Sequence, residues 1–431
     1  MYIGVRIKFY IAVLASIGWF LLSGYISLPW IYELATYIGV IPAYFIVLFI
    51  ALIPGLMQMF LFVAYLLDNR PPPKTLDINP PLTILIAAYN EQSSIGKTLT
   101  SIRNQDYVGE VQVIVIDDGS TDETINIIKS FNLPNLLLIK NTHGGKANAL
   151  NTGLLKAEHS LIVGLDADTQ LRPSALKELV HRLLSDPSDT AGVAGSLFVS
   201  NSRYNILTRM QEFDYFQAIT AIKRVQSLFQ GTLVAQGAFS IYRKECLLEI
   251  GGWPSTVGED IVISWALLTK KYRIGFSEKA VAFTSAPTTY KAYFYQRSRW
   301  ARGMIEAFRF NPSILITPRL TLFFIYWNFF FPIMDLTFVF VFIPGLIMAL
   351  FGHYYIAGPM TLAILPVTLL YNFVFFVTQR RIFTDLKLSV RRNFLGFIMY
   401  VLFYQLIMAP ACVHGYFSEF LSLKKKWGTK K

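Results

Sequence analysis

The spacing of charged residues is the strongest constraint on what this chain can fold into. Three stretches, each longer than 20 residues, contain no Asp, Glu, Lys or Arg; they run from Lys8 to Glu33, from Glu33 to Asp68 and from Arg392 to Glu419. A helix of roughly 20 apolar residues crosses the hydrocarbon core of a bilayer. Each stretch is therefore long enough to form a transmembrane helix.

Another apolar region lies between Arg319 and Arg380, where Asp335 is the only acidic residue. It has room for at least two more crossings, and we expect a break near Gly352 to Pro359. In total we expect about five transmembrane helices, two before the polar part of the chain and three after it. Because a second apolar stretch closely follows the first, a retained anchor is favoured over a cleaved signal peptide.

Composition separates this chain both from ordinary soluble proteins and from pure membrane bundles. Of its 431 residues, 54% are hydrophobic and 15% are charged, and the mean hydropathy is +0.44. We therefore expect a membrane part joined to a polar domain. The two cysteines, Cys246 and Cys412, predict no disulfide framework, which agrees with a reducing compartment.

The formal net charge of +12 does not indicate a nucleic-acid partner, because much of it flanks the apolar stretches. Such basic residues usually mark the cytoplasmic side of a membrane. We therefore expect a multi-pass protein of the plasma membrane, in contact with the lipid bilayer, whose polar region is cytoplasmic. The flanking residues are Arg6, Lys8, Lys74, Arg380, Arg381, Arg391, Arg392 and the terminal "KKKWGTKK".

The terminal lysines disagree with this orientation, since an odd number of crossings leaves them outside. Either the last apolar segment, which contains Pro410, does not fully cross, or the rule fails there.

Three parts are predicted along the chain: two transmembrane helices in 1–70, a cytoplasmic domain in 71–318 that begins with a linker at Pro71 to Pro73, and the remaining helices and basic tail in 319–431. Short apolar runs alternate with helix-like segments in the first half of the domain. This alternation predicts an α/β fold with a mostly parallel sheet covered by helices on both faces. The runs are "LTILIAA", "VQVIVI", "NLLLI" and "SLIVGL".

Polar residues follow these runs, at the strand ends where ligands bind in such sheets. "AYNE" (88–91) follows the first run, "DDGSTDET" (117–124) the second and "DAD" (166–168) the fourth, and "GGKANALN" (144–151) opens the helix after the third. Taken alone, "DDGSTDET" and "DAD" are explained at least as well by a turn or a helix cap, and "GGK" lacks the Walker spacing. Together they predict one ligand site, in which paired aspartates can hold a hard divalent ion.

The ordered set "AAYNE", "VIDDGSTDET", "GGKANALN", "DAD", "GED" and "QRSRW" resembles the processive family-two membrane glycosyltransferases, over about Leu82 to Gly303. These include poly-N-acetylglucosamine, chitin-oligosaccharide, hyaluronan and cellulose synthases, and "IKRVQSLFQGTLVAQGAFSIYRKE" is most similar to the bacterial poly-N-acetylglucosamine enzymes. The resemblance implies a GT-A type domain between transmembrane helices, with interfacial amphipathic helices near its end.

For the donor, the resemblance implies a UDP-sugar and Mg²⁺ or Mn²⁺. Its uracil and ribose would be held by Tyr89 and Glu91 with either Asp117 or Asp118, an alternative that the sequence leaves open. Lys146 would lie near the nucleotide or its diphosphate. Asp166 and Asp168 would bind the metal, with Asp166 also on the nucleotide sugar.

For the acceptor, the resemblance makes Asp260 of "GED" the general base, although family members often carry Thr where this chain has Gly258. Gln296, Arg299 and Trp300 of "QRSRW" would surround the acceptor sugar and the diphosphate. Gln236 and Ala238 of "AQGAF" match the acceptor segment without being assignable to one sugar. Arg297 and Arg302 are expected to be ordinary interfacial charges.

The implied function is inverting polymerisation of a UDP-sugar, most plausibly UDP-N-acetylglucosamine, into a β-linked polysaccharide that leaves through the protein's own helices. A small membrane accessory subunit is a further expected partner. In this scheme Asp335 either lines the channel or lies at the interface, and residues 207–229 form an interfacial or acceptor-groove helix.

A hyaluronan-, chitin- or cellulose-type synthase, which would use a different UDP-sugar, remains an alternative. Two other functions also remain open at this point. One is transfer of a single sugar to a polyprenyl phosphate, as in related enzymes that normally lack "QRSRW". The other is a transporter with a regulatory domain, which leaves the acids at the strand ends without a purpose.

Overall fold

A computed structural model describes residues 3–69, 78–378, 384, 387 and 392–423. The linker prolines, the basic residues Lys74, Arg380, Arg381 and Arg391, and the terminal lysines lie outside the described residues.

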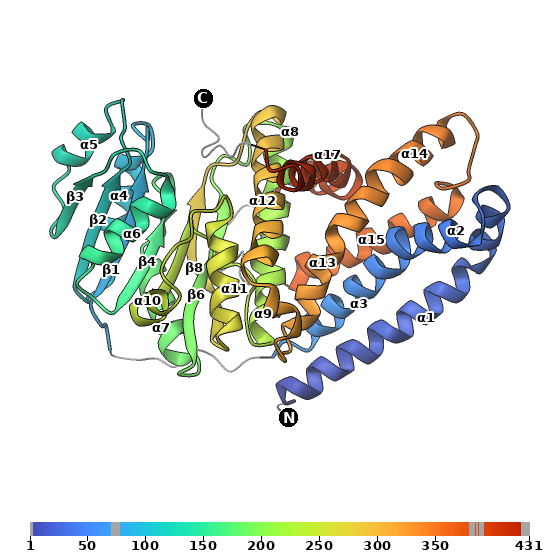
Figure 1. The fold of residues 1–431 in the computed structure, drawn as a ribbon, viewed down its shortest axis with the longest axis horizontal. Helices are drawn as coiled ribbons and strands as arrows, with labels where there is room; N and C mark the ends of the chain where they lie inside the picture. Colours follow the sequence, from blue (N-terminus) through green and yellow to red (C-terminus); the bar gives the residue numbers. More distant parts are fainter. Residues whose placement is uncertain (1–2, 70–77, 379–383, 385–386, 388–391, 424–431) are drawn as a thin grey trace.

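The polar domain is built on one sheet of eight strands in the order β3-β2-β1-β4-β7-β6-β8-β5 (Figure 1). The four predicted apolar runs form β1 to β4, which are parallel neighbours. The other half is mixed, since β7 runs antiparallel to both β4 and β6, whereas β6 and β8 are parallel. The strands are β1 Leu82–Ala88, β2 Val111–Asp117, β3 Leu136–Lys140, β4 Leu161–Leu165, β5 Gln170–Leu171, β6 Thr190–Val199, β7 Phe239–Arg243 and β8 Arg273–Thr284.

Helices pack on both faces of the sheet, which explains why β1, β4 and β6 are buried along their whole length. Strands covered on both faces read as continuous apolar runs rather than alternating ones. The predicted GT-A type α/β fold is thus confirmed, with more antiparallel pairing than expected. The covering helices are α4 Ile95–Arg103, α5 Thr124–Ser130, α6 Lys146–Lys156, α7 Ala175–Ser185, α10 Lys244–Glu249 and α11 Glu259–Thr269.

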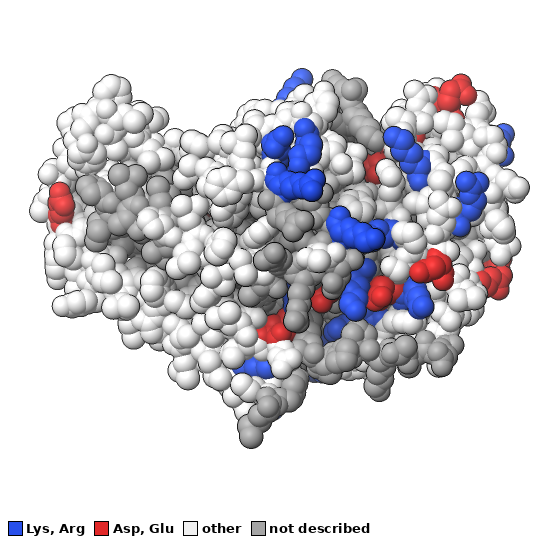
Figure 2. All heavy atoms as spheres, turned by 180° about the vertical axis from the view of Figure 1, so that it is seen from behind, with Lys and Arg blue, Asp and Glu red and all other residues white. Residues whose placement is uncertain are grey.

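Four helical segments in the described part of the chain are long and apolar enough to cross a membrane: Val5–Ile38, Val40–Leu66, Leu322–Leu350 and Phe394–Phe420. They contain α1 Val5–Ile38, α2 Val40–Val47, α3 Ile53–Leu66, α13 Leu322–Thr337, α14 Ile343–Leu350 and α17 Phe394–Phe420. The predicted break is present, because α14 ends at Leu350 and α15 (Pro359–Thr378) begins at Pro359. Figure 2 shows that charged side chains gather over the sheet half of the molecule, whereas the helical half is almost free of them.

A layer of helices lies between the sheet and the apolar helices (Figure 1). It consists of α8 Ile206–Asp214, a π-helical segment Tyr215–Ile222, α9 Lys223–Leu228 and α12 Tyr290–Phe310. Helix α17 packs against both α8 and α12. The predicted amphipathic stretch 207–229 therefore forms part of this layer, and the motif "QRSRW" lies on α12 beside an apolar helix.

The prediction that Arg297 and Arg302 are interfacial charges is wrong. Both are buried, at 2% and 8% exposure, because α17 covers this side of α12. Arg297 pairs with Asp214, and Arg302 pairs with Glu419 of α17. A buried guanidinium needs such a partner to offset the loss of hydration.

Asp335 is also buried, against α17 rather than facing lipid. Gln405 donates to its Oδ1 at 3.3 Å and the Tyr416 hydroxyl donates to its Oδ2 at 2.8 Å. These donors remove the cost of an unpaired carboxylate among apolar helices.

Candidate functional site

The loops that follow β1 and β2 are tied to each other. Ala88 and Asp117 are partners at the carboxyl ends of these parallel strands, so "AYNE" and "DDGSTDET" leave the sheet side by side. The Asn90 amide donates to Ser120 Oγ at 2.9 Å, and the Glu91 amide donates to Thr124 Oγ1 at 2.7 Å. Glu91 also accepts a hydrogen bond from the Ser94 hydroxyl.

Asp117 and Asp118 have different tasks within this loop. The two carboxylate oxygens of Asp118 accept from the amides of Gly144 and Gly145, both at 2.9 Å. Asp118 thereby fixes the "GGK" loop, whose Gly145 adopts φ +88°, a conformation that favours glycine. Asp117 uses Oδ2 for the amides of Gly119 and Ser120, whereas its buried Oδ1 has no hydrogen-bond partner among the described residues. An unpaired buried acceptor is costly, so Asp117 is the aspartate with capacity for a ligand.

His143 lies against Tyr89, with ring centroids 4.5 Å apart. Its Nδ1 lies 3.0 Å from the Asp118 carbonyl oxygen, on the same loop junction. Two adjacent aromatic rings, one of them half-buried Tyr89, form a wall suited to a planar base. The sequence reasoning missed His143, although its position directly before "GGK" was a usable signal.

Lys146 joins the "GGK" helix to two distant motifs. Its Nζ lies 2.7 Å from Asp166 Oδ1 and 2.9 Å from Glu259 Oε1. Burial alone would lower the pKa of Lys146, but the charges of Asp166 and Glu259 raise it above its ordinary value. The ammonium is therefore held charged between "DAD" and "GED". Glu259 is a second residue that sequence reasoning missed; it stands directly before Asp260.

The "AQGAF" segment packs against the same group. The Gly237 amide donates to Asp260 Oδ2 at 3.4 Å, and a β-carbon on Gly237 would lie 2.6 Å from Lys146 Nζ. Gln236 accepts a hydrogen bond from the ammonium of Lys223 on α9. The candidate base thus lies beside both Lys146 and the segment predicted to meet the acceptor.

Helix α12 is joined to the start of α11 by a close backbone approach. A β-carbon on Gly258 would lie 2.4 Å from the Cα of Gly303, and Glu306 of α12 accepts from the amides of Val257 and Gly258 at 2.8 and 3.0 Å. The departure from the family's Thr at Gly258 therefore has a structural reason, since a side chain at this position would separate the two helices.

Trp300 is 44% exposed, and its ring centroid is 6.2 Å from that of Tyr215. The negative charge of Asp168 acts on Tyr215, and the positive charge of Arg299 acts on both Tyr215 and Glu259. Buried Gln296 Oε1 and Arg299 Nε have no hydrogen-bond partner among the described residues. The motif "QRSRW" thus brings polar atoms with spare capacity to the region of "DAD" and "GED".

The described residues contain no group of three or more His, Cys, Asp or Glu side chains arranged to hold a metal ion. Asp166 and Asp168 are half-buried and follow β4 on one turn. Magnesium is commonly bound through one or two carboxylates, with phosphate and water as the other ligands. The donor set therefore fits a metal that arrives with a diphosphate.

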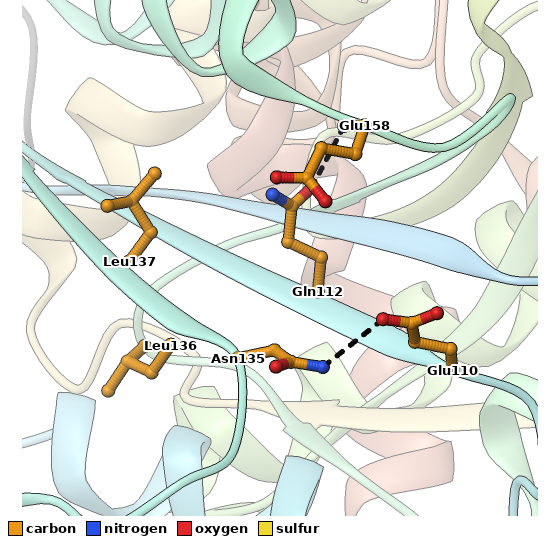
Figure 3. A pocket seen from close by; sticks show the side chains of 6 residues that line it. All are labelled: Glu110, Gln112, Asn135, Leu136, Leu137 and Glu158. Carbon is orange, nitrogen blue, oxygen red and sulfur yellow. Dashed lines mark hydrogen bonds between the residues drawn. The ribbon is translucent and has the colours of Figure 1, made fainter.

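A pocket elsewhere in the domain is not part of this region. Its lining residues precede or begin β2, β3 and β4, at the amino ends of the strands, and Glu110 and Asn135 face each other across it (Figure 3). The motifs discussed above all follow the carboxyl ends. The pocket is lined by Glu110, Gln112, Asn135, Leu136, Leu137 and Glu158.

Comparison with known proteins agrees with this geometry. Residues 83–251 match the family described as glycosyl transferase family 2. The chain is 32% identical over 238 residues to poly-β-1,6-N-acetyl-D-glucosamine synthase of Staphylococcus aureus, covering 54% of this chain and 57% of that protein. It is 33% identical over 225 residues to the protein of the same name from Staphylococcus epidermidis, covering 52% of this chain and 54% of that protein. The matches thus span little more than half the length of these relatives.

A solved mannosyltransferase from Pyrobaculum calidifontis, in complex with GDP-Man and Mn²⁺, shares the fold with a TM-score of 0.59 and 20% identity, covering 88% of this chain and 99% of that one. Residues 83–251 are therefore similar to glycosyl transferase family 2, and the chain is similar to the poly-β-1,6-N-acetyl-D-glucosamine synthases.

Proposed function

We propose that the protein is an inverting, processive glycosyltransferase that polymerises a UDP-sugar, UDP-N-acetylglucosamine first among the candidates, into a β-linked polysaccharide. The observation that carries the proposal is the position of Lys146 between Asp166 and Glu259. It joins the metal and diphosphate motif to the motif of the candidate base, in a domain that matches family 2.

On the donor side, Tyr89 offers a ring to the uracil and Glu91 lies on the same loop. Asp117, through its partnerless Oδ1, accepts from the base, while Asp118 holds the loop that presents Lys146. We therefore assign the contact with the base to Asp117 rather than to Asp118. Lys146 supplies positive charge to the diphosphate end of the donor.

Asp166 and Asp168 would hold Mg²⁺ or Mn²⁺, which when bound stabilises the negative charge of the departing diphosphate. The same residues suit a metal by their chemistry and their half-buried position. The structural relative from Pyrobaculum calidifontis was solved with Mn²⁺ and GDP-Man, which supports a divalent ion in this fold.

On the acceptor side, Asp260 accepts the proton of the attacking hydroxyl. Gln296 and Arg299 provide spare hydrogen-bonding atoms for the acceptor or the diphosphate, and the exposed Trp300 ring provides a flat surface for a sugar. One base on one face favours a direct displacement with inversion at the anomeric carbon. An α-linked donor then yields a β-linked product.

The location of α12 beside α17 supports export of the product through the apolar helices, from a cytoplasmic domain at the plasma membrane. Within this proposal Asp335 belongs to the helices that would surround the product. A small membrane accessory subunit remains part of the proposal, with the lipid bilayer as the surrounding partner.

The experiment is incubation of the purified protein with a panel of labelled UDP-sugars and Mg²⁺ or Mn²⁺, followed by organic extraction and glycosidase digestion. The proposal requires a polymer that stays out of the organic phase and that a matching β-glycosidase degrades. A single-sugar lipid in the organic phase would instead support transfer to a polyprenyl phosphate. Full transport activity in folded Asp260→Asn and Asp166→Ala variants would support a transporter.

A further inference from the structure

Arg297, the second residue of "QRSRW", occupies a buried position with an unusual set of neighbours. Its side chain is 3% exposed, and its Nη2 lies 2.7 Å from Asp214 Oδ2 of α8. The same nitrogen donates to the Tyr404 hydroxyl of α17 at 2.9 Å. The guanidinium is therefore fixed from two sides, by the interfacial layer and by a helix long and apolar enough to cross a membrane.

The third neighbour of this guanidinium is Trp300. The central carbon of Arg297 lies 4.0 Å from the centroid of the Trp300 ring, closer than to the rings of Tyr293 (5.1 Å) and Tyr215 (5.8 Å). Residues three apart on a helix are neighbours on its surface, and tryptophan is the aromatic side chain that attracts a cation most strongly. One side of the indole thus rests on a rigidly held charge.

The rest of the indole is open, since Trp300 keeps 44% exposure in the folded protein. An exposed tryptophan on a helix can adopt several rotamers. Restricting it to one of them when a ligand binds costs conformational entropy. A guanidinium that is itself held by Asp214 and Tyr404 reduces that freedom before any sugar arrives.

We infer that Arg297 is a positioning residue, which holds the Trp300 ring in place as a preformed platform for the acceptor sugar. The inference rests on the proposed function in so far as it assigns the acceptor to Trp300. Because Tyr404 belongs to α17, the platform is set jointly by the catalytic domain and by the helix beside which the product would leave.

Arg302 provides the matched control. It lies on the same helix, is also buried, and pairs with Glu419 at 3.2 Å while donating to the Leu423 carbonyl at 2.7 Å. Its replacement removes the same planar charged group from the same α12–α17 interface without touching the platform. A general weakening of that interface would therefore affect both arginine variants alike.

The test compares Arg297→Lys with Arg302→Lys in the full-length protein in lipid nanodiscs. Lysine keeps the charge for Asp214 but lacks the planar group that stacks on the ring. We expect Arg297→Lys to raise the KM for short N-acetylglucosamine oligosaccharide acceptors by about 2- to 10-fold, less than the roughly 30-fold that complete loss of a strong cation–π contact would cause, because an ammonium still attracts the ring. The affinity for UDP and the KM for the donor stay as in the wild type, and Arg302→Lys changes none of these values.

A second measurement does not depend on turnover. Acrylamide quenching of Trp300, obtained by subtracting the signal of Trp300→Phe in each background, reports how freely the ring is reached. The quenching constant rises in Arg297→Lys and not in Arg302→Lys. Equal values for both variants in quenching and in acceptor KM would overturn the inference. If the wild type forms no product from any UDP-sugar, the proposed function fails, and quenching alone decides the role of Arg297.

Discussion

Removing the Lys146 ammonium tests the connection between "DAD" and "GED" most clearly. In Lys146→Met, Glu259, whose side chain is 9% exposed, loses a partner at 2.9 Å. Breaking a buried ion pair by deleting one partner costs about 3 to 5 kcal/mol, since the other charge stays buried and unpaired. For a domain of 150 to 250 residues, each kcal/mol corresponds to about 2 to 4 °C in Tm. The expected loss is therefore roughly 6 to 20 °C.

The assay is thermal unfolding of the purified protein, followed in a cycle with Glu259→Gln and the double variant. Glutamine removes the unpaired negative charge that Glu259 would carry without Lys146. The loss of unfolding free energy in the double variant should therefore be smaller than the sum of the two single losses, by about 1 to 3 kcal/mol. UDP affinity should fall in every variant that lacks Lys146. A loss of less than about 2 °C in Lys146→Met, or simple additivity in the cycle, would refute the role given to this ammonium.

Three further predictions concern separate parts of the site. Gly258→Thr should lower Tm and abolish activity, because its β-carbon would lie 2.4 Å from Gly303 Cα; a variant with wild-type Tm would contradict the close approach. Asp117→Asn should weaken UDP binding with little change in Tm, whereas Asp118→Asn should lower Tm by freeing the loop at Gly144 and Gly145. Isothermal titration measures the UDP affinity of each variant, and thermal unfolding measures its Tm. Identical behaviour of the two variants would contradict the separate roles given to Asp117 and Asp118. Burial lowers the pKa of Lys223 from 10.5 to about 7, and the charge of Asp260 opposes this shift. Between pH 7 and pH 10 the unfolded chain therefore binds one more proton at Lys223 than the folded chain does. The free energy of unfolding consequently rises with pH over this range. Lys223→Met should flatten that rise in Tm, and an unchanged slope would rule out the titration.

Much of the fold was predictable because apolar patterning is a local property. The runs that form β1 to β4 and the stretches that form α1 to α3 and α17 differ sharply from their flanks in charge and hydropathy. The mixed half of the sheet was not foreseen, since β6, β7 and β8 are separated by long insertions and pair only through tertiary packing. Sequence alone carries no signal for the order in which such strands meet.

The candidate site was predictable in its motifs and less so in its internal contacts. Their positions at strand ends predicted that Asp117 and Asp166 lie at one edge of the sheet. Whether Asp117 or Asp118 accepts hydrogen bonds from the amides of the "GGK" loop depends on where that loop lies, which the sequence does not show. Arg297 was misread because arginine next to an apolar tail is usually interfacial. Its burial follows from α17 crossing α12, a contact between segments about 100 residues apart in the sequence.

A structure of the protein with UDP and Mn²⁺ in lipid would be the most direct test of a single nucleotide-sugar site at the carboxyl edge of this sheet. Density for uracil against Tyr89, with the diphosphate between Lys146 and the Asp166–Asp168 turn, is the expected result. Nucleotide bound at the amino ends of the strands, or anywhere that leaves these side chains untouched, would contradict the proposed site.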